Sequence, residues 1–199
     1  MDEDARRRRG AIAFDAGVCV LLAMATGAVD EAWLSPRGRA LECGEPLPDL
    51  LSRALACLGA RPSCEEASPL LDLAVVVPCA LTACREDSLA FFLSRLKYVL
   101  FLRLLIMVCT ALPPPGAPAQ FDTYIQGSLY QVGCSGHAAL VLLAGIALAT
   151  PSSVPAWLGY AALVSLGIIA SRCHYSLCIF TAWLLVLAVC PLATWPLAA

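Results

Sequence analysis

The stretch HAALVLLAGIALATPSSVPAWLGYAALVSLGIIA, residues 137–170, decides the fold. It contains no Asp, Glu, Lys or Arg, and the turn-forming Pro151-Ser152-Ser153 divides it into two apolar runs. Backbone polar groups in lipid have no water to bond, so such runs cross a membrane as helices. The first run, His137–Thr150, is short for a span, and we therefore extend it back through Gly136. The second run is roughly Val154–Ala170.

The same pattern continues on both sides of this stretch. Four further apolar runs are roughly Ala11–Val29, Pro69–Cys84, Leu89–Leu112 and Leu177–Ala199. Of the 199 residues 60% are hydrophobic and only 14% are charged, whereas a soluble domain carries about a quarter charged residues. The sequence therefore predicts an all-α fold, a polytopic six-helix transmembrane bundle. We expect one membrane domain, residues 11–199, after a basic tail, residues 1–10.

The orientation follows from the arginines at positions 6–9, which the positive-inside rule keeps in the cytosol. Six spans then place both termini there and put connections 30–68, 113–135 and 171–176 outside. Four arginines in the first of these connections nearly balance the cluster. The first run also resembles a secretory signal peptide, but Asp15 interrupts its apolar core, and cleavage would leave an odd number of spans. We prefer a retained span.

Charge and cysteine content exclude some function classes. A net charge of −2 gives no basic field for a nucleic acid. Several of the eleven cysteines lie in apolar runs, where cysteine acts as a small hydrophobe. We expect neither a metal nor another cofactor, because no ligand cluster is visible. Three cysteines share the first outer connection and would form a disulfide there if it faces an oxidising lumen: Cys43, Cys57 and Cys64.

The only two histidines, His137 and His174, lie at predicted helix ends that two spans separate. An even number of crossings returns the chain to the same face, so the two can share one site. Gly136 lets the backbone approach a ligand, and the free N–H groups of a helix N-terminus attract an anion. The alternative is that both histidines are ordinary interfacial polar residues with satisfied hydrogen bonds.

Two arginines strengthen the case for a phosphate ligand. Arg103 lies inside the third predicted span, where a charge is costly, and Arg172 lies two residues before His174. A guanidinium binds phosphate oxygens through a planar fork. Alternatively, Arg103 pairs with Asp72 or extends to an interface, and Arg172 is a plain loop charge.

These residues resemble a known family, the sphingomyelin synthases and related ceramide phosphotransferases, a branch of the lipid phosphate phosphatase superfamily. The resemblance covers about residues 40–199 and rests on four segments in order. They are Pro46-Leu47-Pro48-Asp49, the segment from Arg103 through Pro113 to Pro115-Gly116, Ser135-Gly136-His137 and His174-Tyr175-Ser176.

The resemblance implies phosphocholine or phosphoethanolamine transfer from a phospholipid to ceramide without a cofactor. His174 would attack phosphorus and form a phosphohistidine intermediate, while His137 would protonate the departing diacylglycerol and then deprotonate ceramide. Substrate-binding residues would be Arg103, Arg172, Ser135, Gly136 and Tyr175. The site would face the lumen of the Golgi or another endomembrane, or the cell exterior at the plasma membrane.

The chain departs from the family at Cys178, where the family has an Asp four residues after the nucleophilic histidine. A thiol is a weak hydrogen-bond acceptor, and the expected cost is about four orders of magnitude in rate. The family's acidic residue before Ser-Gly-His is also missing, although Asp122 could supply a carboxylate by another route. Arg172 stands where the family has histidine.

Three functions therefore compete. The first is the transferase, with activity impaired by Cys178. The second is a catalytically silent relative that binds lipid or a membrane partner, and the third is a lipid phosphate phosphatase. The sequence also allows a homo-oligomer.

Overall fold

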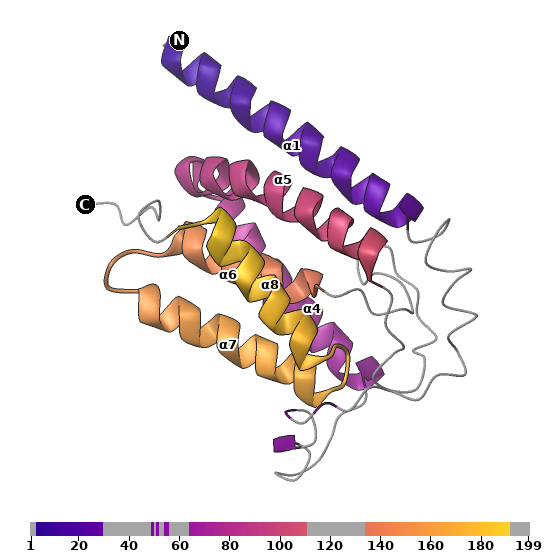
Figure 1. Ribbon diagram of the computed structural model, residues 1–199. Helices are drawn as coiled ribbons and strands as arrows, with labels where there is room; N and C mark the ends of the chain where they lie inside the picture. Colours follow the sequence, from indigo (N-terminus) through magenta and orange to yellow (C-terminus); the bar gives the residue numbers. More distant parts are fainter. Residues whose placement is uncertain are drawn as a thin grey trace.

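The computed structural model describes residues 3–29, 49, 51, 54–55, 64–110 and 134–191. Within these ranges the long elements are all helices, and no strand occurs. The all-α prediction is therefore confirmed for the described part of the chain. The helices are α1 (Glu3–Val29), α4 (Cys64–Ala83), α5 (Glu86–Cys109), α6 (Gly136–Leu148), α7 (Val154–Ala170) and α8 (Ser176–Val189) (Figure 1).

The helix boundaries follow the apolar runs closely at the centre of the fold and less closely at its ends. Helix α7 has the predicted bounds, and α6 begins at Gly136 as expected. Helix α1 begins much earlier than predicted, because the basic stretch is itself helical and Arg7 pairs with Glu3 one turn away, at 2.6 Å. Helix α8 ends at Val189, and residues 192–199 lie outside the described ranges.

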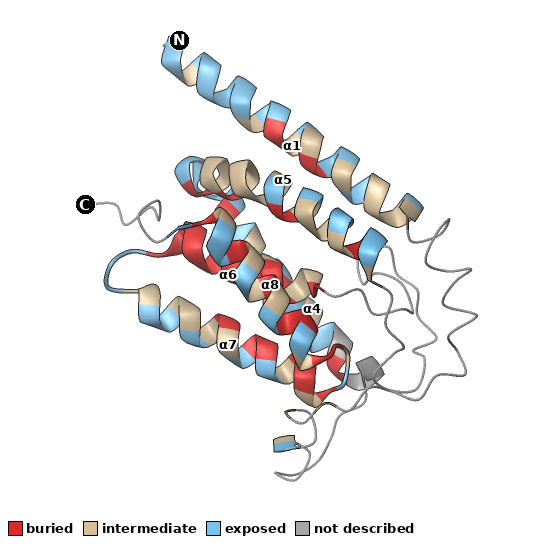
Figure 2. Ribbon diagram, in the orientation of Figure 1, coloured by how far each residue is buried: buried red, intermediate tan, exposed pale blue. Residues whose placement is uncertain are grey.

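Helix α6 is the centre of the bundle and packs against α4, α5, α7 and α8. Its residues from Ala138 to Leu148 are buried except Leu140, whereas most of α1 is exposed (Figure 2). Helix α7 lies close to α6 at Gly145, where an added Cβ would be 3.4 Å from Cβ of Trp157, which is van der Waals contact. The apolar sequence of α6 thus follows from its position, since every side of it meets another helix.

Successive helices run in alternate directions along the bundle (Figure 1). Helix α1 begins and α8 ends at the same end of the molecule, which we call the terminal end. Helices α6 and α8 begin at the opposite end, which we call the site end. This alternation is what six consecutive crossings would require, and it brings the two segments that carry histidines to one end.

By length and composition, one of the described helices could cross a membrane unaided, namely α1. A signal sequence near an N-terminus passes the same test. The apolar helices α6, α7 and α8 are 13 to 17 residues long, and α4 has an apolar part from Pro69 to Ala83. At 1.5 Å per residue such helices reach roughly 20 to 26 Å, against a hydrocarbon thickness of about 30 Å. The described part of the chain is therefore all-helical, and α1 alone among its helices meets the length and composition criterion for a span.

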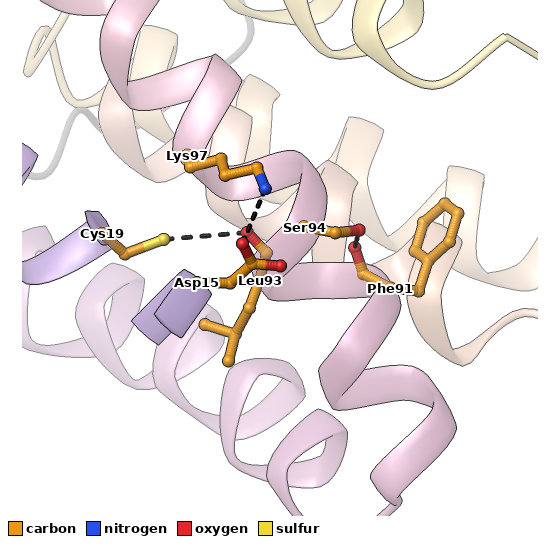
Figure 3. Close-up of polar contacts among 6 residues, drawn as sticks. All are labelled: Asp15, Cys19, Phe91, Leu93, Ser94 and Lys97. Atoms are coloured by element: carbon orange, nitrogen blue, oxygen red, sulfur yellow. Dashed lines mark hydrogen bonds and ion pairs between the residues drawn. The ribbon is translucent and has the colours of Figure 1, made fainter. Parts of the chain in front are cut away.

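Helix α1 lies along α5, and polar contacts join the two helices. Lys97 Nζ lies 2.6 Å from Asp15 Oδ1, and both side chains are mostly buried (Figure 3). The thiol of Cys19 donates to the backbone oxygen of Leu93 at 3.7 Å. Nearer the terminal end, Arg8 pairs with Asp87. Asp15, which interrupts the apolar run of α1, is therefore used to attach this helix to α5.

Candidate functional site

The first turn of α6 forms one wall of the site end. Ser135 is the N-cap residue of α6, and its Oγ accepts a long hydrogen bond from the backbone N–H of Ala138 at 3.4 Å. Its own backbone N–H donates to the backbone oxygen of Cys178 in α8 at 3.1 Å. Ser135 and Cys178 therefore hold the beginnings of α6 and α8 together, so the two histidine-bearing segments share one small region.

His137, the second residue of α6, has a carboxylate partner. Its Nε2 lies 2.8 Å from Oδ1 of Asp72, which comes from α4, and the histidine side chain is 15% exposed. The sequence offered Asp72 as a partner for Arg103, and the structure places it against His137. With Nε2 bonded to a carboxylate, Nδ1 is the ring nitrogen that remains for chemistry.

His174 lies in the turn between α7 and α8 and is 8% exposed. Its Nδ1 has no hydrogen-bond partner among the described residues. Burial, with smaller contributions from His137 and Arg103, lowers the pKa of His174 to about 3, so this imidazole is neutral at physiological pH. A neutral imidazole has one N–H and one lone pair, and an unpaired buried nitrogen costs about 1–3 kcal/mol. The position is energetically expensive without a ligand.

Arg103 of α5 lies beside these histidines. Its Nε donates to the backbone oxygen of Cys134 at 3.4 Å, and its side chain is partly buried. A Cβ added at Gly136 would lie 3.7 Å from the same nitrogen, which is ordinary contact. A side chain at residue 136 would therefore not be excluded by crowding. The distance does show that the guanidinium lies next to the start of α6.

Arg172 and Tyr175 differ in their surroundings from the residues above. Arg172 is exposed and has φ 56°, a left-handed backbone conformation that is uncommon outside glycine. Tyr175 is buried and serves as the N-cap residue of α8 without a side-chain cap. The structure thus brings His137, His174 and Arg103 together and places Arg172 on the surface of the turn. The substrate-binding roles of Arg172 and Tyr175 stay predictions.

Asp49 supplies the cap that Tyr175 lacks. Its two carboxylate oxygens accept from the backbone N–H and the hydroxyl of Ser176, at 2.7 and 2.9 Å. A carboxylate at a helix N-terminus is stabilised by the free N–H groups and the helix dipole there. Asp49 therefore fixes the turn that carries His174, a role that sequence reasoning missed. The only signal for it was the last position of Pro46-Leu47-Pro48-Asp49, whose other residues lie outside the described ranges.

Cys178, the expected substitute for the missing Asp, is fully buried in the first turn of α8. Its backbone N–H and oxygen bond to Tyr175 and Ser135. The unpaired Nδ1 of His174 is consistent with a thiol's being a poor acceptor at this position. Asp122, the other carboxylate considered from sequence, lies outside the described residues.

No group of three or more His, Cys, Asp or Glu side chains within the described ranges could hold a metal ion. The chemistry open to the region is that of two imidazoles, a carboxylate and a guanidinium. Such a set can bind an anion, attack it with a neutral nitrogen and transfer a proton through a second ring.

Comparison with known proteins finds no family model and no curated protein that matches this chain.

Proposed function

We propose that the chain is a six-span membrane protein that binds a phospholipid head group between His137, His174 and Arg103 and transfers it slowly to ceramide. The observation that carries the proposal is the buried, unpaired Nδ1 of His174 beside a carboxylate-bound His137 and a guanidinium. A phosphate group would contact Nε2 of His174, Nδ1 of His137 and the Arg103 guanidinium, which leaves Nδ1 of His174 open to a carboxylate.

The surface of the bundle supports a membrane environment. Large apolar side chains are exposed on the five described helices other than α6, whereas a soluble protein seldom exposes large contiguous apolar patches. Several charged residues lie at helix ends, including the arginines at the start of α1 and Glu86 and Asp87 at the start of α5. Shorter helices can be accommodated by a locally thinner bilayer. The most exposed apolar side chains include Phe14, Leu21, Leu70, Leu163 and Leu184.

The reaction would proceed in two displacements at phosphorus. In the first, a nitrogen of neutral His174 attacks, an N–P bond forms, and the bond to the diacylglycerol oxygen breaks as His137 gives that oxygen a proton. In the second, His137 takes the proton of ceramide's primary hydroxyl, the new oxygen attacks, and the N–P bond breaks to free His174. Asp72 would hold the ring of His137 in position for both steps.

The missing carboxylate predicts slow turnover. After His174 attacks, its ring becomes cationic, and no described residue accepts a hydrogen bond from its Nδ1. In enzymes that lose the acid of such a triad the rate falls by about four orders of magnitude, equivalent to roughly 5 kcal/mol. A silent lipid-binding relative is the second candidate, and the same unpaired nitrogen favours it.

The test is a transfer assay on purified protein in liposomes containing a labelled phosphatidylcholine or phosphatidylethanolamine and ceramide. Cys178→Asp should raise the transfer rate, because it restores the carboxylate that the family has four residues after its nucleophilic histidine and that would accept the Nδ1 proton. Cys178→Asn is the matched control, since it has nearly the same shape but no charge. A parent protein that is already fast, with Cys178→Asp slower, would contradict the proposal. Release of inorganic phosphate from a labelled phosphatidate, without ceramide transfer, would instead indicate a lipid phosphate phosphatase.

A further inference from the structure

The turn that carries His174 also carries a disulfide. Cys173 is disulfide-bonded, whereas the seven other cysteines whose side chains are described have free thiols. Those seven lie in the helices or directly beside them. Cys173 differs because it lies in a turn at the site end, where its backbone N–H donates to Ile168 and its sulfur lies 3.0 Å from the hydroxyl of Ser171.

The sequence limits the number of cysteines that could be the disulfide partner of Cys173. Eleven cysteines occur in the chain, and eight of them are accounted for by the free thiols and Cys173. The three that remain are Cys43, Cys57 and Cys64, all in the connection between α1 and the apolar part of α4. Cys43 and Cys57 lie outside the described residues, as does the side chain of Cys64.

An independent contact shows that this connection reaches the turn. Asp49 belongs to the connection and bonds to both the backbone N–H and the hydroxyl of Ser176, three residues after Cys173. Cys43 is six residues from Asp49, and Cys57 is eight. An extended chain covers about 3.3–3.6 Å per residue, so both are within reach of Cys173.

We propose that the disulfide of Cys173 joins it to Cys43, Cys57 or Cys64, and that the site end faces an oxidising compartment. Stable disulfides form in lumenal and extracellular spaces and are rare in the cytosol. The terminal end, with the arginines of α1, then faces the cytosol. The sidedness rests on the membrane arrangement of the proposed function, whereas the bond itself does not.

Formation of the bond balances as an ordinary thiol–disulfide exchange. Cys173 and its partner each lose a proton, and together they give two electrons to a protein or glutathione disulfide, which is reduced to two thiols. The product joins two segments more than 100 residues apart in sequence. The disulfide would restrict the turn at the residue before His174, whereas the Asp49 cap restricts it at Ser176, after His174.

The bond is tested by alkylating the full-length protein in native membranes under denaturing conditions, before and after reduction, followed by proteolysis and mass spectrometry. We expect Cys173 to be alkylated only after reduction, in a peptide linked to one that contains Cys43, Cys57 or Cys64. Cys173→Ser should free one of those three thiols, whereas the control Cys79→Ser should free none. Alkylation of Cys173 without reductant would overturn the disulfide.

Sidedness is tested on sealed vesicles of known orientation. After mild reduction, a charged maleimide that cannot cross the bilayer should label Cys173 from the lumenal or exterior side. Labelling from the cytosolic side alone would overturn the assigned orientation while leaving the disulfide intact. Neither readout requires turnover, so a failed transfer assay and a failed disulfide assay are distinguishable.

Discussion

The contact between α1 and α5 and the site end both bury polar groups, but they satisfy them differently. Between α1 and α5, Asp15 and Lys97 pair at 2.6 Å. At the site end His137 has Asp72 at 2.8 Å, while Nδ1 of His174 has no partner among the described residues. A satisfied buried pair specifies how helices pack, whereas an unsatisfied buried nitrogen costs free energy until a ligand binds. The comparison therefore distinguishes a polar contact that is already complete from one that still has an unpaired buried nitrogen.

The largest stability effect is expected between α1 and α5. Lys97→Met leaves Asp15 without its cation and should lower the free energy of unfolding by about 3 kcal/mol, the lower end for breaking a buried ion pair. Thermal unfolding in detergent would measure the loss. Replacing both residues, as Asp15→Leu with Lys97→Met, should recover most of it, because no charge is then left unpaired. A single variant as stable as the parent would show that the pair is not structural.

Arg103 should contribute to the affinity for a phospholipid head group and not to helix packing. Arg103→Ala should weaken binding of a phosphocholine lipid by roughly 1 to 3 kcal/mol, the range for losing a charged hydrogen-bond partner. Arg172→Ala should also weaken binding, but less, since its exposed side chain remains in contact with water. Titration of both folded variants with a phosphocholine analogue checks the order. Unchanged affinity in both would leave the histidines alone to support a phosphate site.

His174 should make stability depend on pH. Its folded pKa of about 3 lies below the ordinary value of 6.5, so the unfolded chain takes up a proton first as the pH falls. Stability is therefore complete above pH 6.5 and is lost as the pH falls toward the folded value. Between pH 7.5 and 5.5 the loss is about 1.4 kcal/mol. Thermal unfolding of the parent and of His174→Asn across this pH range isolates the contribution of His174. If the stability of both proteins changed equally with pH, the buried neutral state of His174 would be contradicted.

The smallest effect is expected at the Asp49 cap. Asp49→Ala removes the acceptor for Ser176 and should cost about 1 kcal/mol, as other N-cap replacements do. Asp49→Asn keeps a carbonyl oxygen and should lose less. Hydrogen exchange at the backbone N–H of Ser176 would report the local opening directly. Equally fast exchange in the Asn and Ala variants would show that the charge, and not the hydrogen bond, holds the turn.

The sequence predicted those features that depend on neighbouring residues. Continuous apolar runs gave the helices, including the exact bounds of α7, because a run that excludes charge has to bury its backbone polar groups in a helix. The early start of α1 was missed because hydropathy does not register arginines, which are good helix formers. Of the six expected spans, only α1 meets the length and composition criterion on its own.

The candidate site was predictable only as a set of residue types. The two histidines and Arg103 stood out because charged and titratable groups are rare in this chain. The hydrogen-bond partners at this end of the fold did not stand out in the sequence. Asp72 is 65 residues from His137, and Asp49 is 127 residues from Ser176. Such pairings are set by helix packing, which a single sequence does not reveal. The site roles themselves stay predictions until lipid binding is measured.

The shortness of α6 has a consequence for how a lipid would reach this site. A helix of 13 residues is about 20 Å long, roughly two thirds of the hydrocarbon thickness of an ordinary bilayer. In the proposed arrangement its neighbours shield it from acyl chains, so its first turn can lie below the plane where lipid phosphates normally sit. A phospholipid bound at His137 would then be drawn inward from the leaflet. Bilayers of different acyl-chain length would change the depth of that displacement, so the affinity for lipid should depend on membrane thickness.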